Sequence, residues 1–100
     1  MNFIQQHNKR IQDLCSRHKV KKLYAFGSVL TDQFTNDSDI DLIVVFEPLD
    51  LNKYADNYYN FKFLLEDIFN RPIDLLEEKA IKNPYFKKNV ESKRQLIYGN

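Results

Sequence analysis

The chain has 100 residues, 43% of them apolar, with only two glycines and three prolines, which predicts one compact domain over residues 1–100 with a single modest core. Its formal net charge of +1 argues against a dedicated nucleic-acid binder, for which a strong basic excess is expected. No apolar stretch is long enough to cross a bilayer, and the polar N-terminus does not read as a secretory signal, so we expect a cytoplasmic protein without a membrane partner.

The N-terminal segment is expected to form an amphipathic helix. Its apolar stripe follows helical intervals and consists of Ile4, His7, Ile11, Leu14, Cys15 and His18. The single cysteine, Cys15, cannot form an internal disulfide, and its place on the stripe favours core packing over chemistry. His7 and His18 have no carboxylate or cysteine at ligand spacing, so we assign them no chemistry.

Three short strands and two further helices are expected after it. The apolar run 22–26 is stopped by Gly27, whereas 40–46, "IDLIVVF", is the near-continuous β-branched run of a central strand that is covered on both faces. Residues 51–69 carry a helical apolar stripe made of Tyr54, Tyr58, Phe61, Leu64, Leu65, Ile68 and Phe69, with Tyr59 off it as the best candidate for an exposed contact with a partner or an adenine.

"RPIDLL" is expected to be the third strand, with Pro72 confined to its beginning. An Asn-Pro pair at Asn83 then opens a final helix, which is followed by a small apolar patch at 96–98. The order of elements predicts an α+β (α/β-like) domain, with a small mixed β-sheet of about three to four strands flanked by helices.

Acidic residues are concentrated in one part of the chain. Between Leu23 and Asn52 there is no lysine or arginine, and the acids are Asp32, Asp37, Asp39, Asp41, Glu47 and Asp50. Side chains two apart in a strand share a face, so Asp39 and Asp41 are expected to point the same way and to repel one another unless a cation or a proton intervenes.

A divalent cation would relieve this repulsion, because Mg²⁺ prefers oxygen ligands and commonly uses one or two carboxylates plus substrate phosphates. Asp74 holds a comparable place in the third strand. If that strand lies beside the central one, three carboxylates converge as in a two-metal site that activates an attacking oxygen and steadies a leaving pyrophosphate. Taken alone, Asp39 and Asp41 are equally compatible with a turn or capping role, as we expect for Asp37 and Ser38, and Asp74 alone would favour a structural role.

Gly27 and Ser28 extend this pattern. A strand that ends in Gly-Ser and turns into a short helix offers backbone N–H groups and a hydroxyl to phosphate oxygens. The alternative is a strand-exit glycine followed by a serine N-cap.

Gly27-Ser28 followed by Ser38-Asp39-Ile40-Asp41-Leu42 resembles the signature of the nucleotidyltransferase superfamily that includes DNA polymerase beta, and in particular its small stand-alone MNT-type members. The likeness extends through "RPIDLL" and "NPYFKKNVESKRQLIYG" and so covers most of the chain. The resemblance implies that Gly27 and Ser28 bind the nucleoside triphosphate. It also implies that Asp39, Asp41 and Asp74 bind Mg²⁺, as two ions, and that Asp74 is the base for the acceptor hydroxyl.

The implied reaction is transfer of AMP from ATP with release of pyrophosphate. Small members of this type commonly pair with a HEPN-domain toxin, so the resemblance implies an antitoxin that adenylylates a partner hydroxyl, with tyrosine as the expected acceptor. Many members have a basic residue and a glycine soon after Gly-Ser, where this chain has Thr31 and Asp32. The second hypothesis is therefore an inactive member that neutralises its partner by binding alone.

Two further interpretations stay open. The basic C-terminal residues are a solvated face or a docking surface for an acidic partner or RNA; they are Lys79, Lys82, Lys87, Lys88, Lys93 and Arg94. Transfer to a small molecule or a nucleic-acid end is a third possible activity, for which no segment provides an acceptor site.

Overall fold

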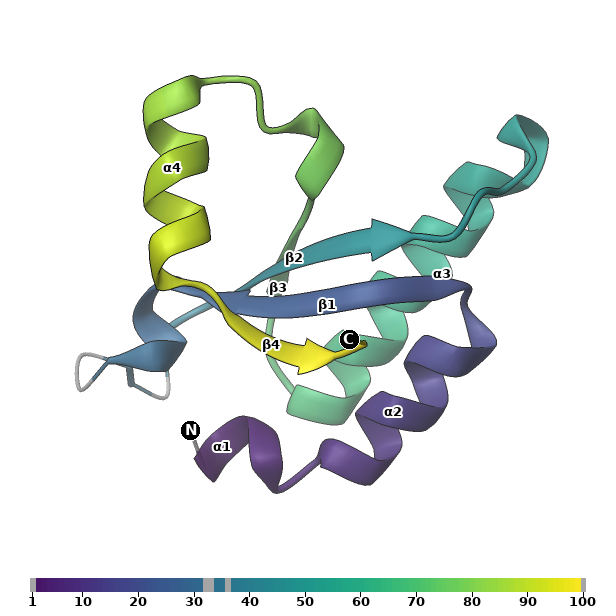
Figure 1. The fold of residues 1–100 in the computed structure, drawn as a ribbon. Coiled ribbons are helices and arrows are strands. Elements are labelled where there is room, and N and C mark those ends of the chain that lie inside the picture. Colours follow the sequence, from purple (N-terminus) through teal and green to yellow (C-terminus); the bar gives the residue numbers. More distant parts are fainter. Residues whose placement is uncertain (1, 32–33, 36, 100) are drawn as a thin grey trace.

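The structure is a computed structural model that describes residues 2–31, 34–35 and 37–99. In chain order the elements are α1 (Asn2–Gln5), α2 (Asn8–Arg17), β1 (Val20–Phe26), the short 3₁₀ helix η1 (Gly27–Leu30), β2 (Ile40–Phe46), α3 (Leu51–Phe69), β3 (Ile73–Glu77), the 3₁₀ helix η2 (Glu78–Ala80), α4 (Pro84–Lys93) and β4 (Gln95–Tyr98). Figure 1 shows the strands as one sheet with helices around it.

The sheet is mixed and has the strand order β3-β2-β1-β4. β1 runs antiparallel to both β2 and β4, whereas β2 and β3 are parallel. A parallel pair needs a crossover connection, and α3 supplies it between β2 and β3. This architecture confirms the expected small mixed sheet flanked by helices.

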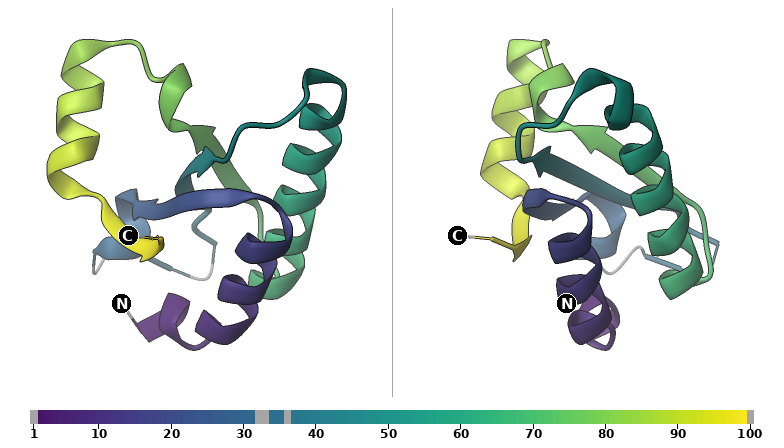
Figure 2. Two further views of the ribbon diagram at one scale, coloured as in Figure 1. Left: turned by 45° about the vertical axis from the view of Figure 1, so that its right-hand side comes forward. Right: turned by 90° about the vertical axis from the view of Figure 1, so that its right-hand side faces the viewer.

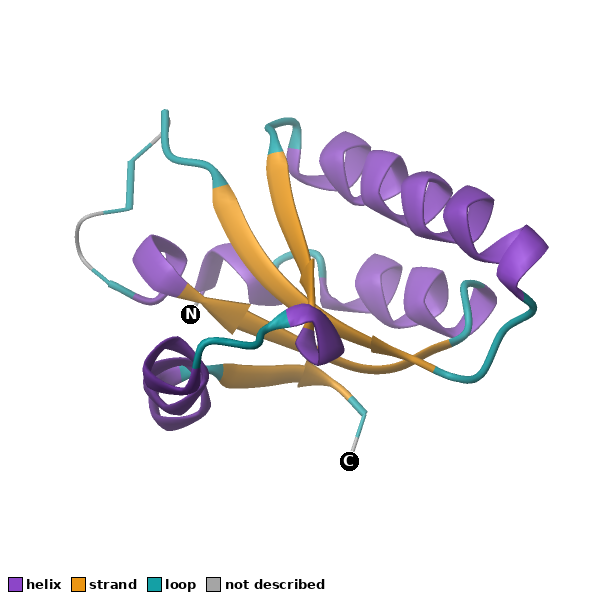
Figure 3. Cartoon of the chain, turned by 90° about the horizontal axis from the view of Figure 1, so that it is seen from above, coloured by secondary structure: helices purple, strands orange, loops and turns teal. Residues whose placement is uncertain are grey.

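Helices cover both faces of the sheet. The right-hand view of Figure 2 shows α4 on one side of the strands and α3 on the other, and Figure 3 shows the strands as a layer between helices. Toward α2 and α3 the sheet presents the main core, in which Ile11, Leu23, Ile40, Phe61 and Leu65 are fully buried.

Toward α4 the sheet presents a smaller apolar cluster. Tyr24, Ile43 and Val90 are its buried members. Since strand residues alternate between faces, Asp41 lies on the same face as Ile43, and Asp74 lies on the face opposite to the buried Ile73 and Leu75. Both aspartates therefore lie on the face that α4 covers.

Two elements differ from the sequence expectation. The N-terminal stripe is divided between α1 and α2, because His7 adopts a non-helical backbone (φ −111°, ψ 15°) while its ring packs edge-on against Phe69 at 5.4 Å. The C-terminal apolar patch forms β4, an edge strand that pairs with β1. On α3, Leu64 was expected in the core but is 41% exposed, whereas Tyr59 is 51% exposed, as its place off the stripe predicts.

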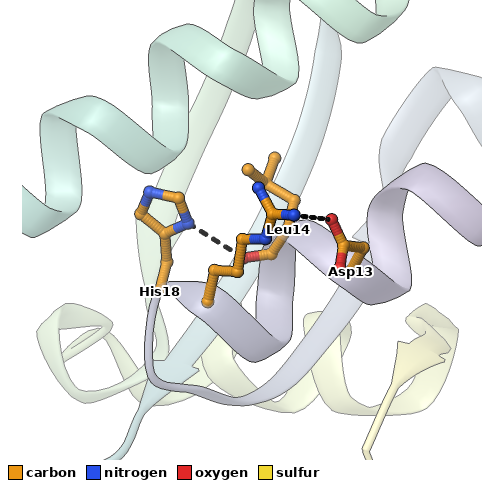
Figure 4. A network of polar contacts seen from close by, with 4 residues as sticks. Asp13, Leu14 and His18 are labelled. Atoms are coloured by element: carbon orange, nitrogen blue, oxygen red, sulfur yellow. Dashed lines mark hydrogen bonds and ion pairs between the residues drawn. The ribbon is translucent and has the colours of Figure 1, made fainter.

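The end of α2 accounts for one of the two histidines. His18 Nδ1 donates to the carbonyl of Leu14 at 2.9 Å, and Asp13 forms an exposed ion pair with Arg17 (Figure 4). His18 thus satisfies a backbone carbonyl at the end of the helix, which is a structural role. None of the helices in the described ranges is both long enough and apolar enough to cross a bilayer.

Cys15 is fully buried in the main core, and this burial raises the pKa of its thiol to about 12. The thiolate is the reactive form, so the folded protein should react very slowly with Ellman's reagent at pH 8 and promptly in denaturant. Fast labelling of the native protein at pH 8 would contradict the packing of α2 described above.

Candidate active site

The three predicted carboxylates come from two adjacent parallel strands. In the β2–β3 register Asp41 lies directly opposite Asp74. Neighbouring strands are about 4.8 Å apart, so the two side chains on the α4 face start from adjacent positions. Asp39 immediately precedes Ile40, the first residue of β2.

The electrostatic environment of Asp41 includes the other two acids. The pKa of Asp41 is raised above its ordinary value of 3.8, first by burial of the half-buried carboxyl and then by the negative charges of Asp74 and Asp39. Asp39 and Asp74 are themselves exposed. The site therefore holds a carboxylate whose ionised form is destabilised at neutral pH and would be stabilised by a cation.

Gly27 lies against the same carboxylate. Phe26, the last residue of β1, is the register partner of Asp41, and Gly27 follows with φ +82° to start η1. A Cβ at this position would stand 2.7 Å from Asp41 Oδ2. Glycine is thus favoured both by the backbone conformation and by the approach of the aspartate.

The half-buried Ser28 is the second residue of η1, in the strand-to-short-helix turn that the sequence predicts. Its carbonyl accepts hydrogen bonds from the backbone N–H of Thr31 at 2.9 Å and from the Thr31 hydroxyl at 3.0 Å. These bonds close the η1 turn beside Asp41. Asp32, which also marks a departure from the family pattern, lies outside the described residues.

Among the described residues, no group of three or more histidine, cysteine, aspartate or glutamate side chains is arranged so that it could hold a metal ion by itself. This is compatible with magnesium chemistry, because Mg²⁺ usually combines one or two carboxylates with waters and substrate phosphates rather than an all-protein cage. The repelling pair Asp41 and Asp74 fits that kind of site.

Arg71 is a functional candidate that the sequence interpretation missed. Its Nη1 donates to the carbonyls of Thr35 and Ser38, both at 3.0 Å. The guanidinium carbon lies 4.7 Å from the ring centroids of Phe3 and Phe34. Arg71 therefore fixes the segment that precedes Asp39 against the segment that precedes Asp74.

Arg71→Lys should lower the free energy of unfolding by about 1 to 2 kcal/mol, because an ammonium cannot reproduce the planar, two-acceptor arrangement between the rings. Urea unfolding followed by circular dichroism measures this. Arg10→Lys, on the exposed surface of α2, is the matched control and should change stability by less than about 0.5 kcal/mol. Equal stabilities for the two variants would show that Arg71 is not an anchor.

The other predicted residues have simpler roles. The Ser38 hydroxyl accepts from the backbone N–H of Thr35 at 3.0 Å, which confirms Ser38 as a turn residue. Five of the six C-terminal basic residues are exposed, but Arg94 is an exception, since it pairs with Glu78 and lies 3.9 Å over the Tyr24 ring. The prediction that this whole stretch is a solvated face is therefore wrong for Arg94, because its guanidinium closes the small core under α4.

Two hollows lie at opposite ends of the sheet. One, of about 380 Å³, is at the ends of β2 and β3 that follow Val44 and Glu77, far along the strands from Asp41 and Asp74. The other, of about 440 Å³, includes Gly27 and so adjoins the carboxylates. The first hollow is lined by Glu47, Glu77 and Glu78, whereas the second adjoins the predicted site residues through Gly27, which lies against Asp41. We therefore favour the second hollow for a ligand of the predicted site.

Comparison with proteins of known name shows similarity in sequence over nearly the whole chain. The family model described as "Nucleotidyltransferase domain" matches residues 7–97. Two proteins of Methanocaldococcus jannaschii, each named "Putative protein adenylyltransferase", are 35% and 34% identical to this chain over 96 and 99 residues, covering 96% of this chain and 90% of each relative.

Several solved structures have a fold similar to that of this chain. A structure described as a "putative minimal nucleotidyltransferase" has a TM-score of 0.76 and 25% identity, covering 92% of this chain and 90% of its own. A toxin–antitoxin crystal structure with AMP-PNP has a TM-score of 0.70 at 20% identity, covering 93% of this chain and 73% of that one.

A complex of tri-AMPylated Shewanella oneidensis HEPN toxin with MNT antitoxin has a TM-score of 0.65 at 20% identity, covering 96% of this chain and 72% of that chain. At this identity the likeness concerns the fold alone. The family model, however, spans most of the chain, and both curated relatives are aligned over nearly all of it. The chain therefore belongs to the nucleotidyltransferase domain family.

Proposed function

We propose that this protein is a Mg²⁺-dependent nucleotidyltransferase that transfers AMP from ATP to a hydroxyl of a partner protein. The observation that carries the proposal is the pairing of Asp41 with Asp74 across β2 and β3, with Gly27 against the Asp41 carboxylate. A cytoplasmic location, where ATP is supplied, is part of this proposal.

Each residue has a role in this reaction. Asp39, Asp41 and Asp74 would hold the magnesium ions, which supply charge neutralisation on the triphosphate and polarise the reacting phosphate. Gly27 and Ser28 would receive the phosphates where β1 turns into η1. Asp74, exposed at the edge strand β3, would accept the proton of the acceptor hydroxyl.

The bond changes follow from these roles. The acceptor oxygen forms a bond to the α-phosphorus of ATP, the bond between that phosphorus and the β-phosphate bridge oxygen breaks, and pyrophosphate leaves. The hydroxyl proton passes to Asp74. Holding donor and acceptor in line is the main contribution of the protein, because orientation can provide a large part of the rate enhancement.

The partner that we propose is a HEPN-domain toxin, with a tyrosine as the acceptor and the present protein as its antitoxin. Two lines of comparison support this. Curated relatives at 34 to 35% identity carry names that assign protein adenylyltransferase activity, and a similar fold occurs in a complex of a HEPN toxin with an MNT antitoxin.

Incubation with α-³²P-labelled ATP, Mg²⁺ and a purified HEPN-domain protein with which this chain forms a complex tests the proposal. The label should move to the partner, and peptide mass spectrometry should locate it on tyrosine. Label that stays in ATP while the two proteins form a complex would reject the transfer reaction and favour the second candidate.

The second candidate is a module that neutralises its partner by binding alone. The absence of any lysine or arginine between Leu23 and Asn52 favours it, because triphosphate sites normally carry a cation close to the phosphates. The double variant Asp39→Asn with Asp41→Asn separates the candidates in cells. Protection from the toxin survives this change if binding is sufficient and is lost if AMP transfer is required.

A further inference from the structure

The proposed triphosphate site has an unbalanced charge. ATP brings several negative charges to a place where the carboxylate of Asp41 is already repelled by the negative charges of Asp74 and Asp39. The segment between Leu23 and Asn52, which carries Gly27 and Asp41, contains no lysine or arginine. A cation that faces the phosphates must therefore come from a distant part of the chain.

The hollow of about 440 Å³ beside Gly27 shows where such a cation lies. One wall comes from the end of β1 and from η1, and the other wall comes from α4, so that the lining residues are Phe26, Gly27, Leu30, Thr31, Asn89 and Lys93. Figure 1 shows the last turn of α4 beside the turn that follows β1. Lys93 is thus brought across the hollow from Gly27 despite a separation of more than 60 positions in sequence.

The neighbouring basic residues either interact with other side chains or lie outside this hollow. Arg94 is bound to Glu78 and stacked on Tyr24, Lys79 pairs with Glu77, and Lys87 lines the hollow at the opposite end of the sheet. Within the described part of the chain, Lys93 forms no ion pair with an acidic side chain. Its ammonium group is therefore available to an anion in the hollow.

The helix that carries Lys93 is firmly held. Asn83 caps its first turn by accepting from the N–H groups of Tyr85 and Phe86, and Val90 is 1% exposed against the sheet. The Phe86 ring packs edge-on against Phe26 at 5.9 Å, so α4 is anchored to the strand that leads into Gly27. Asn89 and Lys93 are one helical turn apart and point from the same face.

We propose that Lys93, with Asn89 one turn before it, forms the outer wall of the nucleotide site and binds the β- and γ-phosphates opposite Gly27 and Ser28. This inference rests on the proposed nucleotidyltransferase function and deepens it. Lys93 supplies the cation that the segment after Gly-Ser does not contain. Asn89 donates its amide N–H groups to the phosphates or to the ribose, for which its side chain has two donors.

A lysine in the last turn of a helix also interacts with the helix dipole, whatever the ligand. Binding measurements on Lys93→Met distinguish the two roles. NMR titrations with Mg–ATP and with AMP should give about tenfold weaker binding of Mg–ATP and unchanged binding of AMP, because only the terminal phosphates reach Lys93. Lys93→Arg should keep most of the Mg–ATP affinity.

Lys88→Met is the matched control, since it removes the same charge from an exposed position of α4 outside the hollow. It should bind both nucleotides like the wild type. Equal weakening by the two methionine variants, or none by Lys93→Met, would overturn the assignment of Lys93. A wild-type protein that binds no Mg–ATP would instead contradict the proposed function itself.

Discussion

Asp41→Asn is expected to reduce AMP transfer about a thousandfold or more while raising the thermal stability of the protein at pH 7. The loss follows because a neutral amide replaces a charged ligand at the centre of the proposed metal site, an interaction that contributes several kcal/mol to the transition state. The gain follows because the replaced carboxylate is destabilised in the fold by burial and by its neighbours Asp74 and Asp39. Transfer of label and a thermal melt measure the two effects on one sample.

The raised pKa of Asp41 determines how the stability of the protein changes with pH. The pKa of Asp41 is higher in the folded state than in the unfolded state, so the folded state binds the proton more tightly. The stability that comes from this tighter proton binding is fully present below the ordinary pKa of 3.8. It is lost as the pH rises through the raised pKa of Asp41 in the folded state. The stability advantage of Asp41→Asn should therefore narrow as the pH is lowered toward 4.

Asp37→Asn is the control for Asp41→Asn, because it removes the same charge from an exposed turn residue of the same segment. It should leave both transfer and the melting temperature close to wild type. Wild-type transfer by Asp41→Asn would remove this carboxylate from the mechanism. A lower melting temperature at pH 7 would contradict the electrostatic description of the site.

Gly27→Ala is expected to reduce transfer about a hundredfold at a modest cost in stability. The new methyl group would stand 2.7 Å from Asp41 Oδ2, which is the mobile end of a side chain, so the carboxylate can turn away while the strands stay in place. A displacement of about 1 Å at a reacting group can cost about a hundredfold in rate. The positive φ of 82° adds about 1 to 2 kcal/mol of backbone strain.

Gly99→Ala provides a matched comparison for this change. Gly99 also has a positive φ, of 96°, and its Cβ would stand 2.3 Å from the backbone carbonyl of Lys21, far from the carboxylates. This variant should lose at least as much stability as Gly27→Ala and keep wild-type transfer at temperatures where it stays folded. If both variants lose transfer equally, the effect of Gly27→Ala is general destabilisation rather than displacement of Asp41.

The elements that carry the site could be predicted from the sequence because their signals are local. The apolar run 40–46 predicts β2 and the helical stripe predicts α3, and both have the expected bounds in the structure. The adjacency of Asp41 and Asp74 then requires only that β3 pairs with β2 in parallel. This pairing is expected because a helix, α3, connects the two strands.

The features that sequence analysis missed depend on contacts between distant segments. β4 is four residues long and half-exposed at an edge, so its pattern was too short to identify as a strand. Arg71 shows its role only when the segment before Asp39 folds over it. Lys93 was one of six similar basic residues, and only the packing of α4 places it beside Gly27.

A crystal structure of the protein with Mn²⁺ and a non-hydrolysable ATP analogue tests most directly whether these carboxylates form the catalytic centre. Anomalous scattering locates Mn²⁺ without reference to the rest of the density. We expect Mn²⁺ bound to carboxylate oxygens of Asp39, Asp41 and Asp74, with the triphosphate against Gly27 and Ser28. Nucleotide and Mn²⁺ bound elsewhere, for example in the hollow at the opposite end of the sheet, would contradict the proposed active site.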